Sequence, residues 1–194
     1  MKKFELPKLI LASGSPRRSE ILTSVGWEFE KIVADVDETE FEGEDPAAYV
    51  QRLARTKAET VGAAYRGQMV LGADTTVVID DRIIGKPVDP DDARRMLRLL
   101  SGRTHEVLTG VALVMNGRAE VGLQRTKVKF GELTEPAIAY LVEYGEPLDK
   151  AGAYAVQAQA ALFIEGIEGD YWNVVGLPIN LVYTLAEKLN REEV

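Results

Sequence analysis

"KLILASGSPRRSEILTSVGWEF", residues 8–29, places an apolar run, a small polar turn and a helix-like segment in immediate succession. The apolar run predicts a buried strand over residues 8–12, and the last segment predicts a helix over 16–25. Ser15 suits the N-cap of that helix, and Gly26 suits its end. A strand that leads directly into a helix is half of the unit from which α/β sheets are built.

The turn between the strand and the helix has the composition of an anion cradle. Ser13 and Ser15 offer two hydroxyls, Gly14 lets the backbone approach a ligand closely, and the helix N-terminus offers free N–H groups. Arg17 and Arg18 add forked donors that suit phosphate oxygens. Two arginines at the positive end of a helix are locally unfavourable, and a bound anion would resolve that conflict. The alternative is an ordinary capped helix whose arginines pair with surface acids.

The rest of the chain alternates strand-like and helix-like segments. The segments predict strands at 28–36 and 69–81, helices at 46–65, 90–100, 134–144 and 178–190, a hairpin over 105–131, and an irregular stretch leading into a strand at 153–175. Asn116-Gly117 is the turn signal of the hairpin. No repeat or linker divides the chain, so residues 1–194 are interpreted as one unit with an α/β fold and a mixed sheet.

The composition narrows the class of protein. Of 194 residues, 46% are hydrophobic, and the formal net charge of −8 argues against nonspecific binding to nucleic acid or an anionic membrane. The chain has no cysteine, which excludes disulfides and thiolate chemistry. No signal peptide or membrane-spanning run is apparent, so we expect a soluble, cytoplasmic protein without a membrane partner.

Two charged residues interrupt apolar patterns. Lys57 falls in step with the apolar face of the helix at 46–65, so its stem either reaches the surface or its ammonium points into a charged site. Asp74 lies inside the strand-like run "VLGADTTVVI", where a carboxylate must be hydrogen-bonded, paired or metal-bound. Lys86, in the turn "GKP", is by itself weak evidence of function.

Asp35, Asp37 and Glu38 form an acidic group at the end of the predicted strand 28–36. Carboxylates near phosphate-binding residues suggest Mg²⁺ or Mn²⁺, which prefer oxygen ligands. The alternative is a solvated acidic loop on an acidic protein. His105, the only histidine, has no Ser/His/Asp spacing around it and is interpreted as structural.

Seven motifs in register resemble the Maf family of nucleoside triphosphate pyrophosphatases, from about residue 8 to 180. They are "LASGSPRR", "LARTKA", "GADTTVV", "GKP", "LSGRTHEVLTGVAL", "EPLDKAGAYAVQ" and "NVVGLP". The resemblance implies a mixed, twisted central sheet flanked by helices, with two lobes around a deep cleft, as in Maf and ITPase-like folds. It also implies cleavage of a nucleotide between its α- and β-phosphates with a divalent metal, and possible homodimers.

The family's functional residues carry over by motif. Asp74 matches the proposed proton acceptor, and Glu38 lies in the acidic motif as a metal or base-assisting residue, so Glu38 and Asp74 are the implied metal ligands. The phosphate-handling positions match Ser13, Arg17, Arg18, Lys57 and Lys86, with Lys57 also counted as catalytic.

The resemblance also implies a substrate. Arg17, Thr75 and Gln157 match the branch of the family that acts on dTTP and UTP rather than 7-methyl-GTP. Ala158 departs from the pattern, because many relatives have glycine after the glutamine, and its methyl group bears on how Gln157 meets the base. Two other functions stay open from the residues alone: a noncatalytic nucleotide-binding regulator of septum formation, and a phosphomonoesterase.

Overall fold

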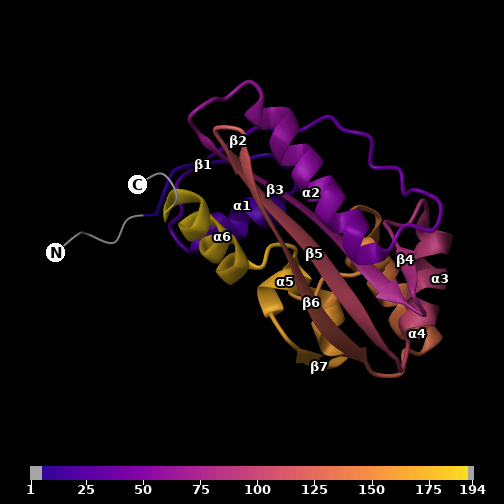
Figure 1. Ribbon diagram of the computed structural model, residues 1–194. Helices are drawn as coiled ribbons and strands as arrows, with labels where there is room; N and C mark the ends of the chain where they lie inside the picture. The colour runs from indigo at the N-terminus through magenta and orange to yellow at the C-terminus, as the bar shows by residue number, and fades with distance from the viewer. Residues whose placement is uncertain (1–5, 192–194) are drawn as a thin grey trace. The chain divides into compact units, whose positions relative to one another are not determined.

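The computed structural model describes residues 6–191, and within this range seven strands form one mixed sheet (Figure 1). The strand order is β2-β1-β3-β5-β6-β7, with β4 paired to β3. Pairing is parallel for β1 with β2 and with β3, and antiparallel for β3 with β4 and for β6 with β7. The α/β class and the mixed sheet expected from the sequence are confirmed.

The elements follow the predicted order. The strands are β1 Leu9–Leu11, β2 Phe29–Lys31, β3 Met69–Ile79, β4 Arg82–Ile84, β5 Thr104–Met115, β6 Arg118–Phe130 and β7 Ile164–Glu168. The α-helices are α1 Pro16–Ser24, α2 Pro46–Gly62, α3 Pro90–Leu100, α4 Glu135–Tyr144, α5 Tyr171–Val175 and α6 Ile179–Arg191. Short 3₁₀ helices are η1 Pro147–Asp149, η2 Ala151–Ala153 and η3 Gln159–Leu162.

Two predicted elements differ in extent. The strand predicted over 28–36 is only Phe29–Lys31, because its partner β1 is three residues long and turns away at the Ser-Gly-Ser loop. The irregular stretch predicted over 153–175 contains 3₁₀ turns, β7 and α5 rather than one extended segment. None of the described helices has both the length and the apolar character that a membrane-crossing helix requires.

The chain divides into two compact units. The first comprises residues up to Asp74, Thr109–Gln124 and the residues from Gly176; the second comprises Thr75–Leu108 and Arg125–Val175. The boundaries fall inside β3, β5 and β6, so each of these strands contributes to both units. The two lobes around a deep cleft stay a prediction.

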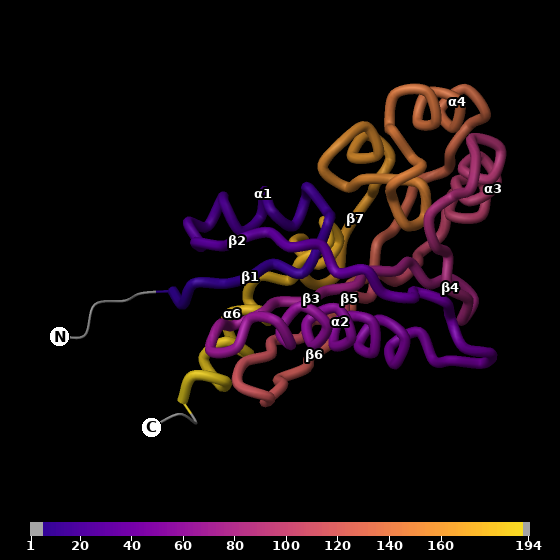
Figure 2. The backbone as a smooth tube through the Cα atoms, turned by 90° about the horizontal axis from the view of Figure 1, so that it is seen from above, coloured from indigo at the N-terminus to yellow at the C-terminus, as the bar shows by residue number. Residues whose placement is uncertain are grey.

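In the first unit, α1 and α2 lie on opposite sides of the sheet around β1 (Figure 2). The chain runs from β1 through α1 to β2 on one side, and then returns through α2 to β3 on the other side of β1. Right-handed crossovers in opposite directions place the two helices on opposite faces. This reversal is a topological switch point, and ligands of open α/β sheets bind outside the carboxyl ends of the strands there.

Helix α2 packs unusually close to the sheet. Asp45 caps it by accepting hydrogen bonds from the backbone N–H groups of Ala47 and Ala48, and its predicted apolar stripe is buried. A Cβ on Gly72 of β3 would lie 2.1 Å from the Ala54 carbonyl oxygen, and one on Gly110 of β5 would lie 2.2 Å from that of Val50. Only glycine fits at these two positions, because the helix backbone takes the space of a side chain.

The opposite face of the first unit is covered by α6. Val121 of β6 packs against the cluster that includes Ala54 and Ala58 of α2, whereas a Cβ on the next residue, Gly122, would contact Leu181 and Leu185 of α6. Successive strand residues point to opposite faces, so the two helices sandwich the sheet.

The second unit has its own buried cluster. His105 of β5 stacks on Phe130 of β6, and its Nε2 is 2.7 Å from the Tyr154 hydroxyl. Burial lowers the pKa of His105 to about 4, so the ring is neutral at physiological pH. The interpretation of His105 as structural agrees with this position.

Candidate active site

The candidate site lies at the switch point of the first unit. Strand β1 ends at Leu11 opposite Leu71 of β3, and β3 continues through Gly72 to Asp74, alongside the turn that follows β1. Asp74 shares a face of β3 with Val70 and Gly72 because strand side chains alternate, and that face carries α2. The carboxylate predicted to interrupt an apolar strand is therefore buried beneath a helix.

Lys57 of α2 is the partner of Asp74. Its Nζ lies 2.6 Å from Asp74 Oδ1 and 2.7 Å from Oε1 of Glu38, which belongs to the loop after β2. The Lys57 and Asp74 side chains are 9% and 12% exposed, whereas Glu38 is 53% exposed. The ammonium is therefore held between one buried and one half-exposed carboxylate, and of the two alternatives for Lys57 the structure selects the charged site.

Burial has the largest effect on the pKa of Asp74. Loss of water raises the pKa of its carboxyl above the ordinary value, although the positive charges of Lys57 and Arg18 oppose that rise and Glu38 adds to it. A carboxylate with a raised pKa is a stronger base than an exposed aspartate, which suits a group that must take a proton from water.

Arg18 is buried under the turn predicted to be an anion cradle. Its Nη1 donates to Ser13 Oγ at 3.0 Å, and its Nε donates to the Gly176 carbonyl oxygen at 2.9 Å. Burial lowers the pKa of the Arg18 guanidinium, while the negative charge of Asp74 opposes this effect. A cation fixed beside Asp74 by two anchors supplies charge for a phosphate without having to reorganise.

Ser15 differs in its contacts from the capping role predicted for it. Ser15 stands at the N-cap of α1, but its side chain makes no capping hydrogen bond. Its backbone N–H donates to Ser13 Oγ at 3.2 Å, a local contact within the turn. Arg17, the other arginine of the motif, is half-buried on the first turn of α1.

Three predicted site residues belong to the second unit. Thr75 is the first residue after Asp74 on β3, and its side chain faces the opposite side of the strand. Lys86 follows β4 and Gln157 lies in the turn before η3, and both are exposed. Their part in the site stays a prediction.

The carboxylates of the site fit a divalent metal only in part. Asp37 Oδ1 accepts hydrogen bonds from the backbone N–H and the hydroxyl of Thr39, so it closes a local turn. Within residues 6–191, no three or more histidine or acidic side chains gather around one point. Glu38 and Asp74 are the pair that already shares a cation, the Lys57 ammonium. Mg²⁺ characteristically uses one or two carboxylates and completes its shell with water and substrate phosphates.

Sequence reasoning did not identify the residues that hold Glu38 in place. Arg52 of α2 forms two hydrogen bonds to Glu44, and the Tyr49 hydroxyl donates to the Glu38 carbonyl oxygen at 3.0 Å. The signal that could have identified them is the polar face of α2, which follows a loop rich in acidic residues in the sequence. Gly72, two residues before Asp74, was also missed, although a glycine inside a strand indicates a close backbone approach.

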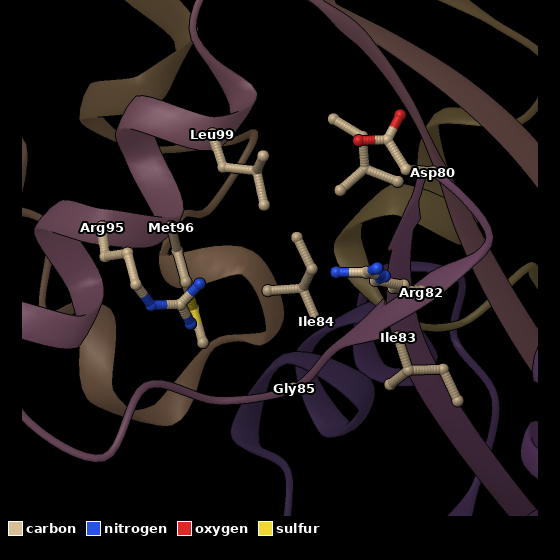
Figure 3. Close-up of a pocket in the computed structure, with 9 residues that line it drawn as sticks. Asp80, Arg82, Ile83, Ile84, Gly85, Arg95, Met96 and Leu99 are labelled. Atoms are coloured by element: carbon tan, nitrogen blue, oxygen red, sulfur yellow. The ribbon is translucent and has the colours of Figure 1, made fainter.

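A cavity of about 330 Å³ lies elsewhere, within the second unit (Figure 3). Its lining comes from the end of β3, from β4 and from α3, and Ile84, Met96 and Leu99 supply apolar wall. No residue predicted for the site lines it.

Comparisons with known proteins agree with the motifs. A family model described as Maf-like protein matches residues 8–189. A dTTP/UTP pyrophosphatase of Symbiobacterium thermophilum is 51% identical over 175 residues, 90% of each chain, and one of Koribacter versatilis is 49% identical over 180 residues, 93% of each chain. The structure of the Staphylococcus aureus Ham1 protein matches with a TM-score of 0.50 and 13% identity, covering 93% of this chain and 98% of that one, which is a likeness of fold alone.

The motifs, the fold and the relatives of this chain agree. The family model covers nearly all of the described residues, and the two relatives share about half of their aligned residues with this chain. The chain belongs to the Maf family.

Proposed function

We propose that this protein is a nucleoside triphosphate pyrophosphatase that hydrolyses dTTP and UTP, and modified pyrimidine nucleotides, to the monophosphate and pyrophosphate. The observation that carries the proposal is a buried aspartate, Asp74, held by Lys57 at 2.6 Å and influenced by the buried charge of Arg18. Its location at a topological switch point supports a nucleotide ligand. Relatives named dTTP/UTP pyrophosphatase support the reaction, which would serve to clear unwanted nucleotides.

In the proposed reaction, Asp74 orients a water and accepts its proton as the water oxygen attacks the α-phosphorus. The bond from that phosphorus to the oxygen bridging to the β-phosphate breaks, and pyrophosphate leaves with the electron pair. Arg17, Arg18 and Lys57, with Lys86 on the strength of its motif, would neutralise charge on the phosphates. Ser13 would bind an oxygen of the substrate at the turn.

A divalent cation, Mg²⁺ or Mn²⁺, is part of the proposal, with Glu38 and Asp74 as its protein ligands. When bound, it supplies positive charge that polarises a phosphate oxygen. Lys57 Nζ now lies within hydrogen-bonding distance of both carboxylates, so we expect the ammonium to shift toward the phosphates when the ion and the substrate bind.

The experiment is to incubate the purified chain with Mg²⁺ or Mn²⁺ and a panel of ordinary and modified nucleoside triphosphates, and to identify the products by chromatography. We expect monophosphate and pyrophosphate in equal amounts, fastest from dTTP and UTP. Orthophosphate as the released product would indicate a phosphomonoesterase. Tight binding without any product would revive the noncatalytic regulator of septum formation, which the names of the relatives do not favour.

Substrate choice is proposed to depend on Arg17, Thr75 and Gln157. An amide that hydrogen-bonds the base edge penalises a base that leaves it unpaired. Gln157→Ala should therefore reduce the ratio of dTTP to GTP hydrolysis. Gln159→Ala, two residues further along, is the matched control, and an unchanged ratio in both variants would remove Gln157 from base recognition.

The proposal extends to assembly and location. Homodimers are implied by the family resemblance, and sedimentation of the purified chain over a range of concentrations tests them. A cytoplasmic location fits a nucleoside triphosphate as substrate, and fractionation of the source cells tests it.

A further inference from the structure

Residues 37–44 form a segment, here called the acidic strap, that leads from the end of the β2 region to α2. The strap contains neither helix nor strand, and residues 37–43 are exposed, whereas the Glu44 side chain is only 9% exposed. It nevertheless delivers the Glu38 carboxylate to within 2.7 Å of Lys57 Nζ. An exposed irregular segment loses conformational entropy when it is held in one place, so specific contacts must fix it.

Arg52 supplies most of these contacts. Its Nε and Nη2 donate to the two carboxylate oxygens of Glu44, both at 2.6 Å, and Nη2 also donates to the Thr39 carbonyl oxygen at 3.1 Å. The guanidinium carbon lies 4.0 Å from the centre of the Phe41 ring. One side chain of α2 thus binds the strap near both ends and in the middle. A forked pair with a stacked ring is far more specific than a single surface ion pair.

Tyr49 adds a contact at Glu38 itself. Its hydroxyl donates to the Glu38 carbonyl oxygen at 3.0 Å, and its ring lies 5.6 Å from the Arg52 guanidinium carbon. Tyr49 and Arg52 are three residues apart, so they lie on one side of α2. The backbone of Glu38 is fixed by one residue of the helix, and its carboxylate meets another.

We propose that Arg52 is a positioning residue, which clamps the acidic strap to α2 so that the Glu38 carboxylate stays at Lys57 and Asp74. The inference rests on the proposed function, in which Glu38 is a ligand of the divalent cation. The hydrogen bonds of Arg52 go to Glu44 and Thr39 of the strap, so its effect on turnover passes through Glu38.

The first test is hydrogen exchange of the nucleotide-free protein, which requires no activity. In Arg52→Met, peptides covering residues 37–44 should exchange at least about tenfold faster, as expected when a surface segment loses its local stability. Arg55→Met is the matched control, since Arg55 is on the same helix and pairs with Glu59 at 2.7 Å in an exposed ion pair. Exchange in the strap should be unchanged in that control.

The second test is a double-mutant cycle on turnover. Arg52→Met should lower kcat about tenfold with little change in KM, in the range for coupled neighbours. Arg52→Lys, which keeps the charge but not the fork, should fall between. In a Glu38→Gln background, Arg52→Met should change kcat by less than about twofold, because the group through which it acts is already lost.

The outcomes of the two tests distinguish failure of the Arg52 clamp from failure of the proposed pyrophosphatase function. If peptides from the strap exchange hydrogen in Arg52→Met at the same rate as in the wild type, the clamp is overturned, whether or not the protein hydrolyses nucleotides. If exchange is faster but Arg52→Met lowers kcat by the same factor with and without Glu38→Gln, Arg52 does not act on turnover through Glu38. A wild-type protein without pyrophosphatase activity defeats the proposed function and with it the role in turnover, and hydrogen exchange then decides the clamp alone.

Discussion

Replacing Gly72 with alanine tests whether the close contact of α2 with β3 assembles the site. The new Cβ would lie 2.1 Å from the Ala54 carbonyl oxygen, 2.8 Å from the Ala58 backbone nitrogen and 3.0 Å from the Ala58 Cβ. Nonbonded carbon and oxygen atoms in close contact are about 3.3 Å apart, so the helix must retreat by about 1 Å. Lys57 precedes Ala58 on that helix, and its 2.6 Å hydrogen bond to Asp74 would be lost or lengthened.

Two effects should follow from that retreat. Overpacking should reduce the free energy of unfolding by about 1–3 kcal/mol, measured by urea denaturation. A displacement of about 1 Å at the reacting groups should reduce kcat by about 100-fold in variants that remain folded. Gly110→Ala should act in the same direction at the other end of the contact, because its Cβ would lie 2.2 Å from the Val50 carbonyl oxygen.

The control for Gly72→Ala is Gly166→Ala in β7, where a Cβ would meet nothing within 4 Å. We expect that variant to remain within about 0.5 kcal/mol of the wild type, as surface substitutions usually do. The reasoning is refuted if Gly72→Ala keeps both the stability and the kcat of the wild type, because the helix then tolerates a side chain that the structure excludes.

Three further predictions concern titrating groups. Asp74→Asn should lower kcat by about 10²–10⁴-fold, as loss of a general base does, while calorimetry still detects nucleotide binding; near-full turnover would exclude Asp74 as the base. Lys57→Met should raise the pKa of Asp74 further and Glu38→Gln should lower it, because their charges act on it with opposite signs; carbon NMR of the carboxyl measures both shifts, and shifts in the same direction would contradict the assignment. In the unfolded chain His105 takes up a proton below its ordinary pKa of 6.5, whereas burial lowers the pKa of the folded ring to about 4. The free energy of unfolding should therefore decrease by up to about 3 kcal/mol as the pH is lowered from 6.5 to 4. His105→Gln should remove that share of the pH dependence, and an unchanged slope would show that the ring is not buried in its neutral form.

Local patterns in the sequence determined the elements. The cap at Asp45 and the apolar stripe of α2 were readable because helix periodicity and capping depend on residues a few positions apart. The Asn116-Gly117 turn was readable for the same reason, since both residues adopt positive φ and few others do so at low cost. Asp74 and Lys57 were also identifiable, because a charge inside an apolar pattern must find a partner.

Tertiary structure alone decided which partner each charge has. The sequence places Lys57 and Asp74 on different elements, and only the close contact at Gly72 brings their side chains to 2.6 Å. It equally gives no sign that Arg18 is anchored by the Gly176 carbonyl oxygen, 158 residues away in the chain. The hold of Arg52 on residues 37–44 is of the same kind, because it depends on how a loop without regular structure lies against a helix. Periodicity reports which face of an element is buried, but the distance between two faces depends on the backbones and side chains of both.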